Sequence, residues 1–271
     1  MDRTLFTPPM IETFRVCRRA YQLAFHSKQG TAGEPTRLST LCKRFLLKAL
    51  AEINRSRIHT LPQVQKYLGQ NWPADRLVSQ DDSDAQEKTI QAFRFVYRIL
   101  MHYIKAPYKP QGSEVAAVSL KVRARVVHSK AYLEDSFDLI LWHPEKRILE
   151  LVDFHLQPLK PFDPAWPAAT LLIRHFLAQR LRGRWPFDKL VFTFCQLQSN
   201  GLVPVSVELD EAVVRLHWPE VLKTIDEIKE EQEFAPHRSS LCKRCHFLQE
   251  CIAMGGVKSQ VCEKDNVGYC A

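Results

Sequence analysis

Residues 132–157, YLEDSFDLILWHPEKRILELVDFHLQ, contain the pattern that predicts the centre of the fold. The segments SFDLILW (136–142) and RILELVDF (147–154) are rich in the β-branched, aromatic and aliphatic residues typical of strands. Between them, HPEK (143–146) supplies the proline and polar residues that end a strand. Because so short a connection favours antiparallel pairing, we expect a β-hairpin here.

Each strand of this hairpin carries one aspartate in apolar surroundings, Asp138 in FDLI and Asp153 in LVDF. An isolated buried carboxylate is costly, so two of them are expected to share a proton, a cation or a metal. Magnesium is commonly held by one or two carboxylates together with a phosphate substrate. The pair is therefore a candidate metal site. In the alternative interpretation, each aspartate lies at a strand end and caps a neighbouring turn.

Helical and strand patterns extend outward from the hairpin in both directions. Before it, apolar residues recur at helical spacing in four segments, residues 9–26, 37–54, 61–72 and 88–105. The segment EVAAVSLKVRARVV (114–127) then predicts a strand that leads into the hairpin. After it we expect a helix beyond Pro167 and then two strands and a long helix, over residues 188–197, 201–209 and 212–234. This order predicts an α/β fold in which helices surround a mixed sheet.

Composition and charge narrow the class of protein. The chain has 271 residues, 45% of them hydrophobic, with a net charge of +8 and a pI near 9.1, which suits a polyanionic partner. No apolar run approaches the length of a membrane span, and the N-terminus lacks the apolar segment of a secretory signal. Eight cysteines without an export signal indicate a reducing compartment, where thiols act as metal ligands or core residues. We therefore expect a cytoplasmic protein that contacts no membrane.

The C-terminal part carries a C-x2-C-x5-C pattern made of Cys242, Cys245 and Cys251. A C-x2-C pair presents two thiolates from one turn, which suits zinc or an iron–sulfur cluster. Three ligands need a fourth, for which the sequence offers two sources. A local ligand, His246 or Cys262, would complete a zinc site. The other source is Cys17 in FRVCRRAYQL, where basic neighbours favour the thiolate.

Taken together, the segment around Cys17, the two-acid hairpin and the late cysteine pattern resemble the RecB-like branch of the PD-(D/E)XK nucleases. More narrowly, they are similar to the iron–sulfur members of that branch, which include the AddB-type helicase–nuclease domain. The resemblance extends from about Thr13 to Cys251. It implies one restriction-endonuclease-like domain over residues 1–271, with a helical N-terminal part, a nuclease core and a cysteine-rich tail over residues 1–110, 111–234 and 235–271.

The resemblance also implies a 4Fe–4S cluster that joins the N- and C-terminal segments. Its ligands would be Cys17, Cys242, Cys245 and Cys251. Zinc stays as the alternative cofactor.

Family chemistry carries over to the hairpin residue by residue. Asp138 matches the metal-binding acid of the GxxD element, with Asp135 where the glycine usually stands, and Asp153 matches the acid of the DYK element. The resemblance implies that Asp138 and Asp153 hold magnesium or manganese for the hydrolysis of a phosphodiester. His155 stands where the family has its lysine. A histidine is mostly neutral at physiological pH, so it cannot supply the lysine's permanent charge, and as a softer ligand it favours manganese.

Two more family features are missing. The histidine of the second helix has no match in LCKRFLLKALAE (41–52), and the QxxxY element is absent from ATLLIRHFLAQR (169–180). Together with the lost lysine, these departures indicate a degenerate nuclease whose exonuclease-type cleavage is weakened or lost. Lys121 and Lys160 are candidates for a relocated lysine, although a solvated surface position is the simpler interpretation of both.

The segment KVRAR alternates basic and apolar residues, so Lys121, Arg123 and Arg125 share one strand face. Cations in a groove follow phosphates, and aromatic side chains stack on exposed bases. The basic face is weak evidence by itself, but together with the resemblance it favours a DNA-binding protein. The resemblance implies single-stranded or end-containing DNA and a helicase or other repair protein as partners. The alternatives are a non-catalytic DNA-binding or scaffolding subunit, and a zinc-binding protein unrelated to nucleases. In the simplest alternative, this basic face is solvated and nearby acidic side chains balance its charge.

Overall fold

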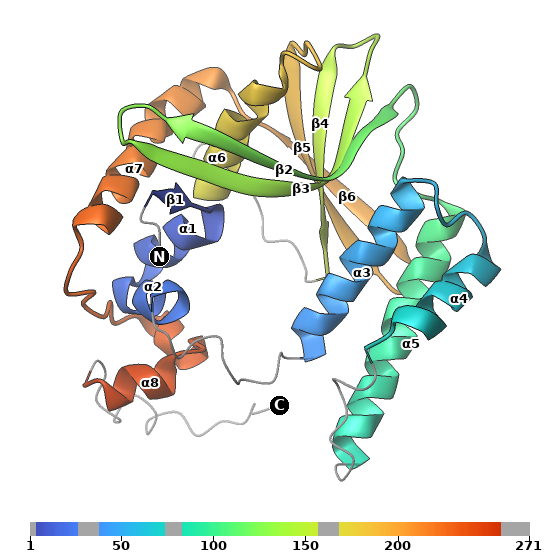
Figure 1. Ribbon diagram of the computed structural model, residues 1–271, viewed down its shortest axis with the longest axis horizontal. Helices are drawn as coiled ribbons and strands as arrows, with labels where there is room; N and C mark the ends of the chain where they lie inside the picture. The colour runs from blue at the N-terminus through green and yellow to red at the C-terminus, as the bar shows by residue number, and fades with distance from the viewer. Residues whose placement is uncertain (1–3, 27–37, 74–82, 157–167, 256–271) are drawn as a thin grey trace.

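The computed structural model describes residues 4–26, 38–73, 83–156 and 168–255 (Figure 1). Its centre is a six-stranded mixed sheet with helices on both faces. The strands are β1 (Leu5–Phe6), β2 (Glu114–Val126), β3 (Ala131–His143), β4 (Ile148–His155), β5 (Lys189–Gln198) and β6 (Gly201–Glu208). The predicted α/β fold, a mixed sheet flanked by helices, is confirmed at this level.

The predicted hairpin is formed by β3 and β4, which pair antiparallel from Leu139↔Val152 to His143↔Ile148. On its other edge β3 pairs antiparallel with β2 along its whole length. The connection after β4 contains a helix and returns the chain to β5, which lies parallel to β4 and antiparallel to β6. The two-residue β1, which the pattern did not predict, pairs in parallel with the start of β3.

Five helices lie close to their predicted positions: α3 (Leu38–Asn54), α4 (Leu61–Asn71), α5 (Ser83–Lys105), α6 (Ala169–Ala178) and α7 (Glu211–Glu230). Helix α5 begins five residues before its predicted start at residue 88, because Ser, Asp and Glu are well tolerated in a first helical turn. None of the described helices combines the length and the apolar composition that crossing a membrane requires.

The single helix predicted over residues 9–26 is wrong. The structure has two helices there, α1 (Pro8–Val16) and α2 (Arg18–Phe25), separated by Cys17 in an extended conformation with φ −162° and ψ 117°. Apolar side chains continue at helical spacing across the junction, so the pattern gave no sign of the break. As a result, the Cys17 side chain leaves the chain at a helix junction rather than from a helix side.

Two hydrophobic cores lie on opposite faces of the sheet. Helices α1, α6 and α7 cover one face, and α3, α4 and α5 cover the other (Figure 1). Because successive residues of a strand point to opposite faces, neighbouring residues of β4 enter different cores: Leu151 joins the α6 side and Val152 the α3 side. The sheet is therefore buried on both faces around the hairpin.

The two ends of the described chain meet. After α7 the chain forms a short 3-10 helix, η3 (Ser240–Arg244), and α8 (Leu248–Ala253). Leu23 of α2 and Cys251 of α8 share a small buried cluster. Figure 1 shows α8 beside α2, far from α3 to α5.

The sheet forks where β3 and β4 stop pairing, and we call this point the fork. The last pair is Leu139↔Val152, so Asp138 and Asp153 are the first residues beyond it on their strands. From Asp153 onward β4 pairs only with β5. Across from Asp138, Ser119 of β2 has a φ of 53°, a left-handed conformation that a non-glycine residue adopts at a cost of about 1–3 kcal/mol. The backbone is thus distorted beside the two aspartates.

Candidate functional site

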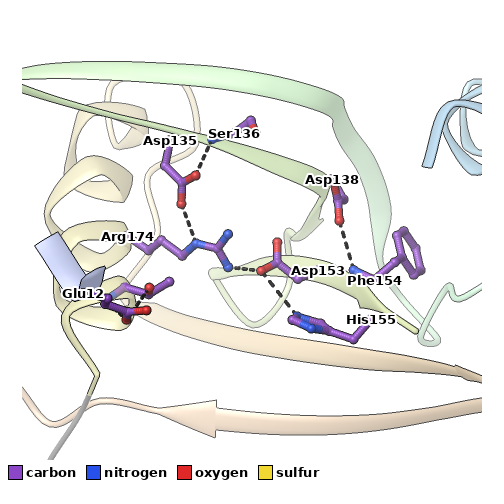
Figure 2. Close-up of polar contacts among 9 residues, drawn as sticks. Glu12, Asp135, Ser136, Asp138, Asp153, Phe154, His155 and Arg174 are labelled. Carbon is purple, nitrogen blue, oxygen red and sulfur yellow. Dashed lines mark hydrogen bonds and ion pairs between the residues drawn. The ribbon is translucent and has the colours of Figure 1, made fainter. Parts of the chain in front are cut away.

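The fork brings three of the predicted site residues together, Asp138 from β3 and Asp153 and His155 from β4 (Figure 2). The backbone N–H of Phe154 donates to Oδ2 of Asp138 at 3.0 Å and so links the two strands after their ladder ends. The alternative interpretation expected each aspartate to cap a turn, and within the described residues neither does. Both carboxylates instead make contacts between different segments of the chain.

Arg174 of α6 completes this cluster, and the sequence analysis missed it. Its Nε donates to Oδ2 of Asp135 at 2.7 Å, and its Nη1 donates to Oδ2 of Asp153 (Figure 2). The guanidinium also lies 5.8 Å from the ring centroid of Phe137. The side chains of Arg174, Asp135 and Asp153 are only 12%, 15% and 11% exposed, so this is a largely desolvated ionic cluster.

The sequence did hold a signal for Arg174. It lies three residues after Leu171 and three before Leu177, and both leucines are buried. Residues three apart share a helix face, so this spacing places a charge on the packed side of α6. A charge in that position needs a buried partner, which marks Arg174 as a candidate site residue.

Glu12 of α1 fixes the first turn of α6. Its Oε1 accepts hydrogen bonds from the backbone N–H and the Oγ1 hydroxyl of Thr170, at 3.0 and 2.6 Å. The residue at the N-cap position, Ala168, has no polar side chain that could accept a hydrogen bond from the backbone N–H groups of the first turn. A carboxylate also interacts favourably with the positive end of the helix dipole. Glu12 thereby holds α6 one turn before Arg174.

Burial decides the protonation behaviour of the remaining side chains at the fork. It raises the pKa of Asp138, against the opposing effects of the Phe154 N–H, Arg174 and Lys43. Burial also lowers the pKa of His155, and the nearby Lys43 ammonium lowers it further. His155 is therefore neutral at physiological pH. Its Nε2 is buried without a hydrogen bond among the described residues and lies 3.9 Å from Oδ2 of Asp153.

As arranged, the fork does not fit a divalent metal. Oδ2 of Asp153 accepts from Arg174, and Oδ2 of Asp138 accepts from Phe154. Within the part of the chain that the structure describes, no three His, Cys, Asp or Glu side chains form a group that could hold a metal ion. The binding of magnesium or manganese by Asp138 and Asp153 stays a prediction.

A cavity of about 470 Å³ opens beside Asp138 on the α3 side of the fork. Lys48, Arg55 and Tyr67 contribute to its walls, and the strained Ser119 lies at its edge. Arg55 pairs with Glu52 at 3.0 Å, whereas Lys48 forms no ion pair with any described residue. The cavity thus combines a carboxylate with an available cation.

The predicted nucleic-acid contacts on β2 are exposed and share one face, as their alternation implies. Two of them already have an acidic neighbour: Lys121 Nζ lies 2.6 Å from Glu134 Oε1, and Arg123 Nε lies 3.8 Å from its Oε2. Arg123 also lies 5.1 Å from the ring centroid of Tyr132. Glu134 therefore balances part of the charge that this face offers to a phosphate.

All four predicted cluster ligands line one cavity of about 330 Å³, together with His246. The backbone N–H of His237 donates to Sγ of Cys17 at 3.4 Å, and that of Ser239 donates to Sγ of Cys242 at 3.5 Å. Amide donors of this kind stabilise thiolates and cluster sulfurs. The thiols thus suit a cluster by their chemistry, although no three of them form a group that could hold a metal ion in the described residues. Cys262 and Lys160 lie outside the described residues.

Comparisons with known proteins give distant likenesses only. No protein-family description and no curated protein matches the sequence. A crystal structure described as a "Putative exonuclease" from Eubacterium rectale is similar over 90% of this chain and 88% of its own, with 12% identity and a TM-score of 0.49. The crystal structure of SSO0001 is similar over 79% of this chain and 95% of its own, with 13% identity and a TM-score of 0.31. These TM-scores are too low for the likeness to support an assignment.

Proposed function

We propose that this chain is a DNA-binding protein on a RecB-like, restriction-endonuclease-like core, in which metal-dependent phosphodiester hydrolysis is weakened or lost. The observation that carries the proposal is the fork itself. Asp138 and Asp153 meet there from neighbouring strands, as the two acids of such a nuclease site must, but both are engaged by other groups of the protein.

Two features at the fork account for weakened hydrolysis. The lysine of the resembled family is replaced by His155, which is half-buried and, with its lowered pKa, neutral, so it cannot stabilise developing negative charge on a phosphate. The carboxylate of Asp153 is held by Arg174. A non-catalytic DNA-binding subunit is the second candidate, and Arg174 is the observation that favours it.

The most suitable path for a nucleic-acid strand runs along α3 toward the fork. Lys43, Arg44 and Lys48 are exposed on this helix, and none forms an ion pair with a described residue. Lys43 is close enough to influence the pKa of both Asp138 and His155. Free cations bind phosphates with release of counterions, whereas cations already paired with an acid contribute less.

The experiment is DNA binding by fluorescence anisotropy, with single- and double-stranded oligonucleotides and the full chain at several salt concentrations. Reversing both free charges in K43E/K48E should weaken binding by about tenfold or more and flatten its salt dependence. The matched variant K121E/R123E also reverses two charges, but on residues that face Glu134, and should cost less. Absence of binding by the unchanged protein would overturn the proposal, and a larger loss in K121E/R123E would move the DNA path to β2.

The same proposal includes a 4Fe–4S cluster held by Cys17, Cys242, Cys245 and Cys251. It is supported by the shared cavity of the four thiols and by the two N–H···S contacts. When bound, the cluster would supply a cross-link between the α1–α2 junction and the C-terminal segment. Brown protein with acid-labile sulfide after anaerobic purification would support it. Colourless protein with one equivalent of zinc would instead favour the zinc site, to which His246 also has access.

A further inference from the structure

We infer that Arg174 is the resident cation of the fork, occupying by its charge and contacts the place that a divalent metal would need. The inference rests on the proposed function only in taking the fork as a nuclease-like acid site. It goes beyond that function by naming the side chain that closes the site.

The contacts of Arg174 span the fork. Its Nε donates to Asp135 on β3 and its Nη1 donates to Asp153 on β4, so one guanidinium joins the two strands after their ladder has ended (Figure 2). A guanidinium suits this task because its donors are fixed in one plane and can reach two acceptors at once. The predicted metal would join the same two strands through Asp138 and Asp153, so Asp153 is the carboxylate that the two arrangements share.

Arg174 is held where it is by its surroundings. Phe137 lies on one side of the guanidinium, and the Glu12–Thr170 hydrogen bonds fix the first turn of the helix that carries it. The side chain is 12% exposed, so its charge is largely removed from water and depends on the two carboxylates. Moving it aside would leave those carboxylates buried without the cation that neutralises them, which is strongly unfavourable.

Asp135 is the second half of this arrangement. It stands at the position where the resembled family has glycine, and a glycine there could not accept the Arg174 Nε–H. Asp135 and Arg174 are therefore complementary. Without Arg174, no cation among the described residues would contact the largely buried Asp135 carboxylate, and without Asp135 the guanidinium would keep only its contact with Asp153. The cluster thus holds one cation between two carboxylates, and the guanidinium engages Oδ2 of each.

The test is a manganese titration of the full chain, followed by the EPR signal of free Mn²⁺. Four proteins are compared: the unchanged chain, Asp153→Asn, Arg174→Gln and the double variant. The unchanged chain and Asp153→Asn should bind Mn²⁺ equally weakly. Arg174→Gln should gain one site at least about tenfold tighter, and the double variant should lose it again. In the unchanged chain, a site that Asp153→Asn abolishes would overturn the inference, as would no gain in Arg174→Gln.

One comparison within this titration and one additional measurement cover the case of a variant that does not fold and separate this inference from the proposed function. If Arg174→Gln does not fold, the comparison between the unchanged chain and Asp153→Asn alone decides, because a resident arginine predicts no Asp153-dependent site. DNA binding is measured on the same preparations with and without EDTA, and should be unaffected by the chelator. A chain that binds neither Mn²⁺ nor DNA would contradict the proposed function while leaving Arg174 as the closing group.

Discussion

Asp138 is the one carboxylate at the fork that no cation contacts directly in the described residues. Burial raises its pKa, so the folded state favours the protonated form. For a raised pKa, the contribution to stability is present below the ordinary value of 3.8 and is lost as the pH rises through the folded-state value. Ionised Asp138 therefore costs stability at neutral pH.

The variant Asp138→Asn tests whether ionised Asp138 lowers the free energy of unfolding. It cannot ionise, and its side-chain oxygen can still accept the Phe154 N–H. We expect it to be more stable than the unchanged protein near neutral pH, with a difference that shrinks as the pH falls toward about 4. Urea unfolding at both pH values measures this. A variant that is less stable at neutral pH would mean that a cation favours the ionised form.

Arg174 and Asp153 should be strongly coupled. Removing one partner of a buried ion pair typically costs about 3–5 kcal/mol, so Arg174→Gln and Asp153→Asn should each lower the free energy of unfolding substantially. The double variant should cost about 1–3 kcal/mol less than the sum of the two.

The exposed pair Lys189–Glu208, at 2.7 Å, is the matched control for this cycle. Its coupling should stay below about 1 kcal/mol because both side chains are solvated. Equal coupling energies for the two pairs in urea unfolding would contradict the buried role of Arg174.

His155→Lys restores the lysine of the resembled family. It separates two explanations for a lack of cleavage: the missing lysine alone, or the contact of Arg174 with Asp153. We expect no cleavage of DNA by this variant with magnesium or manganese, because Arg174 still engages Asp153 and a second cation is added nearby. Cleavage by His155→Lys would show that the missing lysine alone had silenced the site.

Helix α6 carries Arg174, and its position depends on a contact from α1. Replacing Glu12 by Gln should lower stability by about 0.5–2 kcal/mol, the usual range for a lost helix cap. Hydrogen exchange of the α6 amides should speed up at the same time. The control is Asp210→Asn, since Asp210 accepts the Ala212 N–H at the start of α7 at 2.6 Å. That variant should loosen α7 and leave α6 protected, and faster exchange of α7 in Glu12→Gln would contradict the assignment.

At the level of elements, the sequence was informative wherever the determining pattern is local. The β3–β4 hairpin follows from two apolar strands around HPEK, and α3 to α7 follow from helical periodicity. The break at Cys17 and the short β1 do not follow from such patterns, because helical spacing continues through the first and the second depends on pairing with β3.

The fork shows the same limit. The hairpin pattern identified Asp138 and Asp153, the resemblance added His155, and the structure does bring the three together. Arg174 was detectable as a charge on a packed helix face, but its partners were not. Asp135 and Asp153 come from other segments, and only the sheet and the α1–α6 contact bring them to it.

Across the whole molecule, the α1–α2 region and the C-terminal part of the described chain meet at the cavity lined by the cysteines. If a cluster joins them, Cys17→Ser should lose metal and sulfide and lower the melting temperature, because the other three ligands come from the opposite end of the chain. The control Cys42→Ala removes a thiol from the second core and should keep the metal content. Unchanged metal content and melting temperature in Cys17→Ser would exclude Cys17 as a ligand.

The most direct test of the central claim is a combined binding and cleavage assay on anaerobically purified protein. Single- and double-stranded DNA are incubated with magnesium or manganese, and Asp153→Ala is assayed in parallel to exclude contaminating nucleases. We predict DNA binding without cleavage, since Arg174 engages Asp153 and His155 is neutral. Cleavage that disappears in Asp153→Ala would contradict the account and make the fork a working nuclease site.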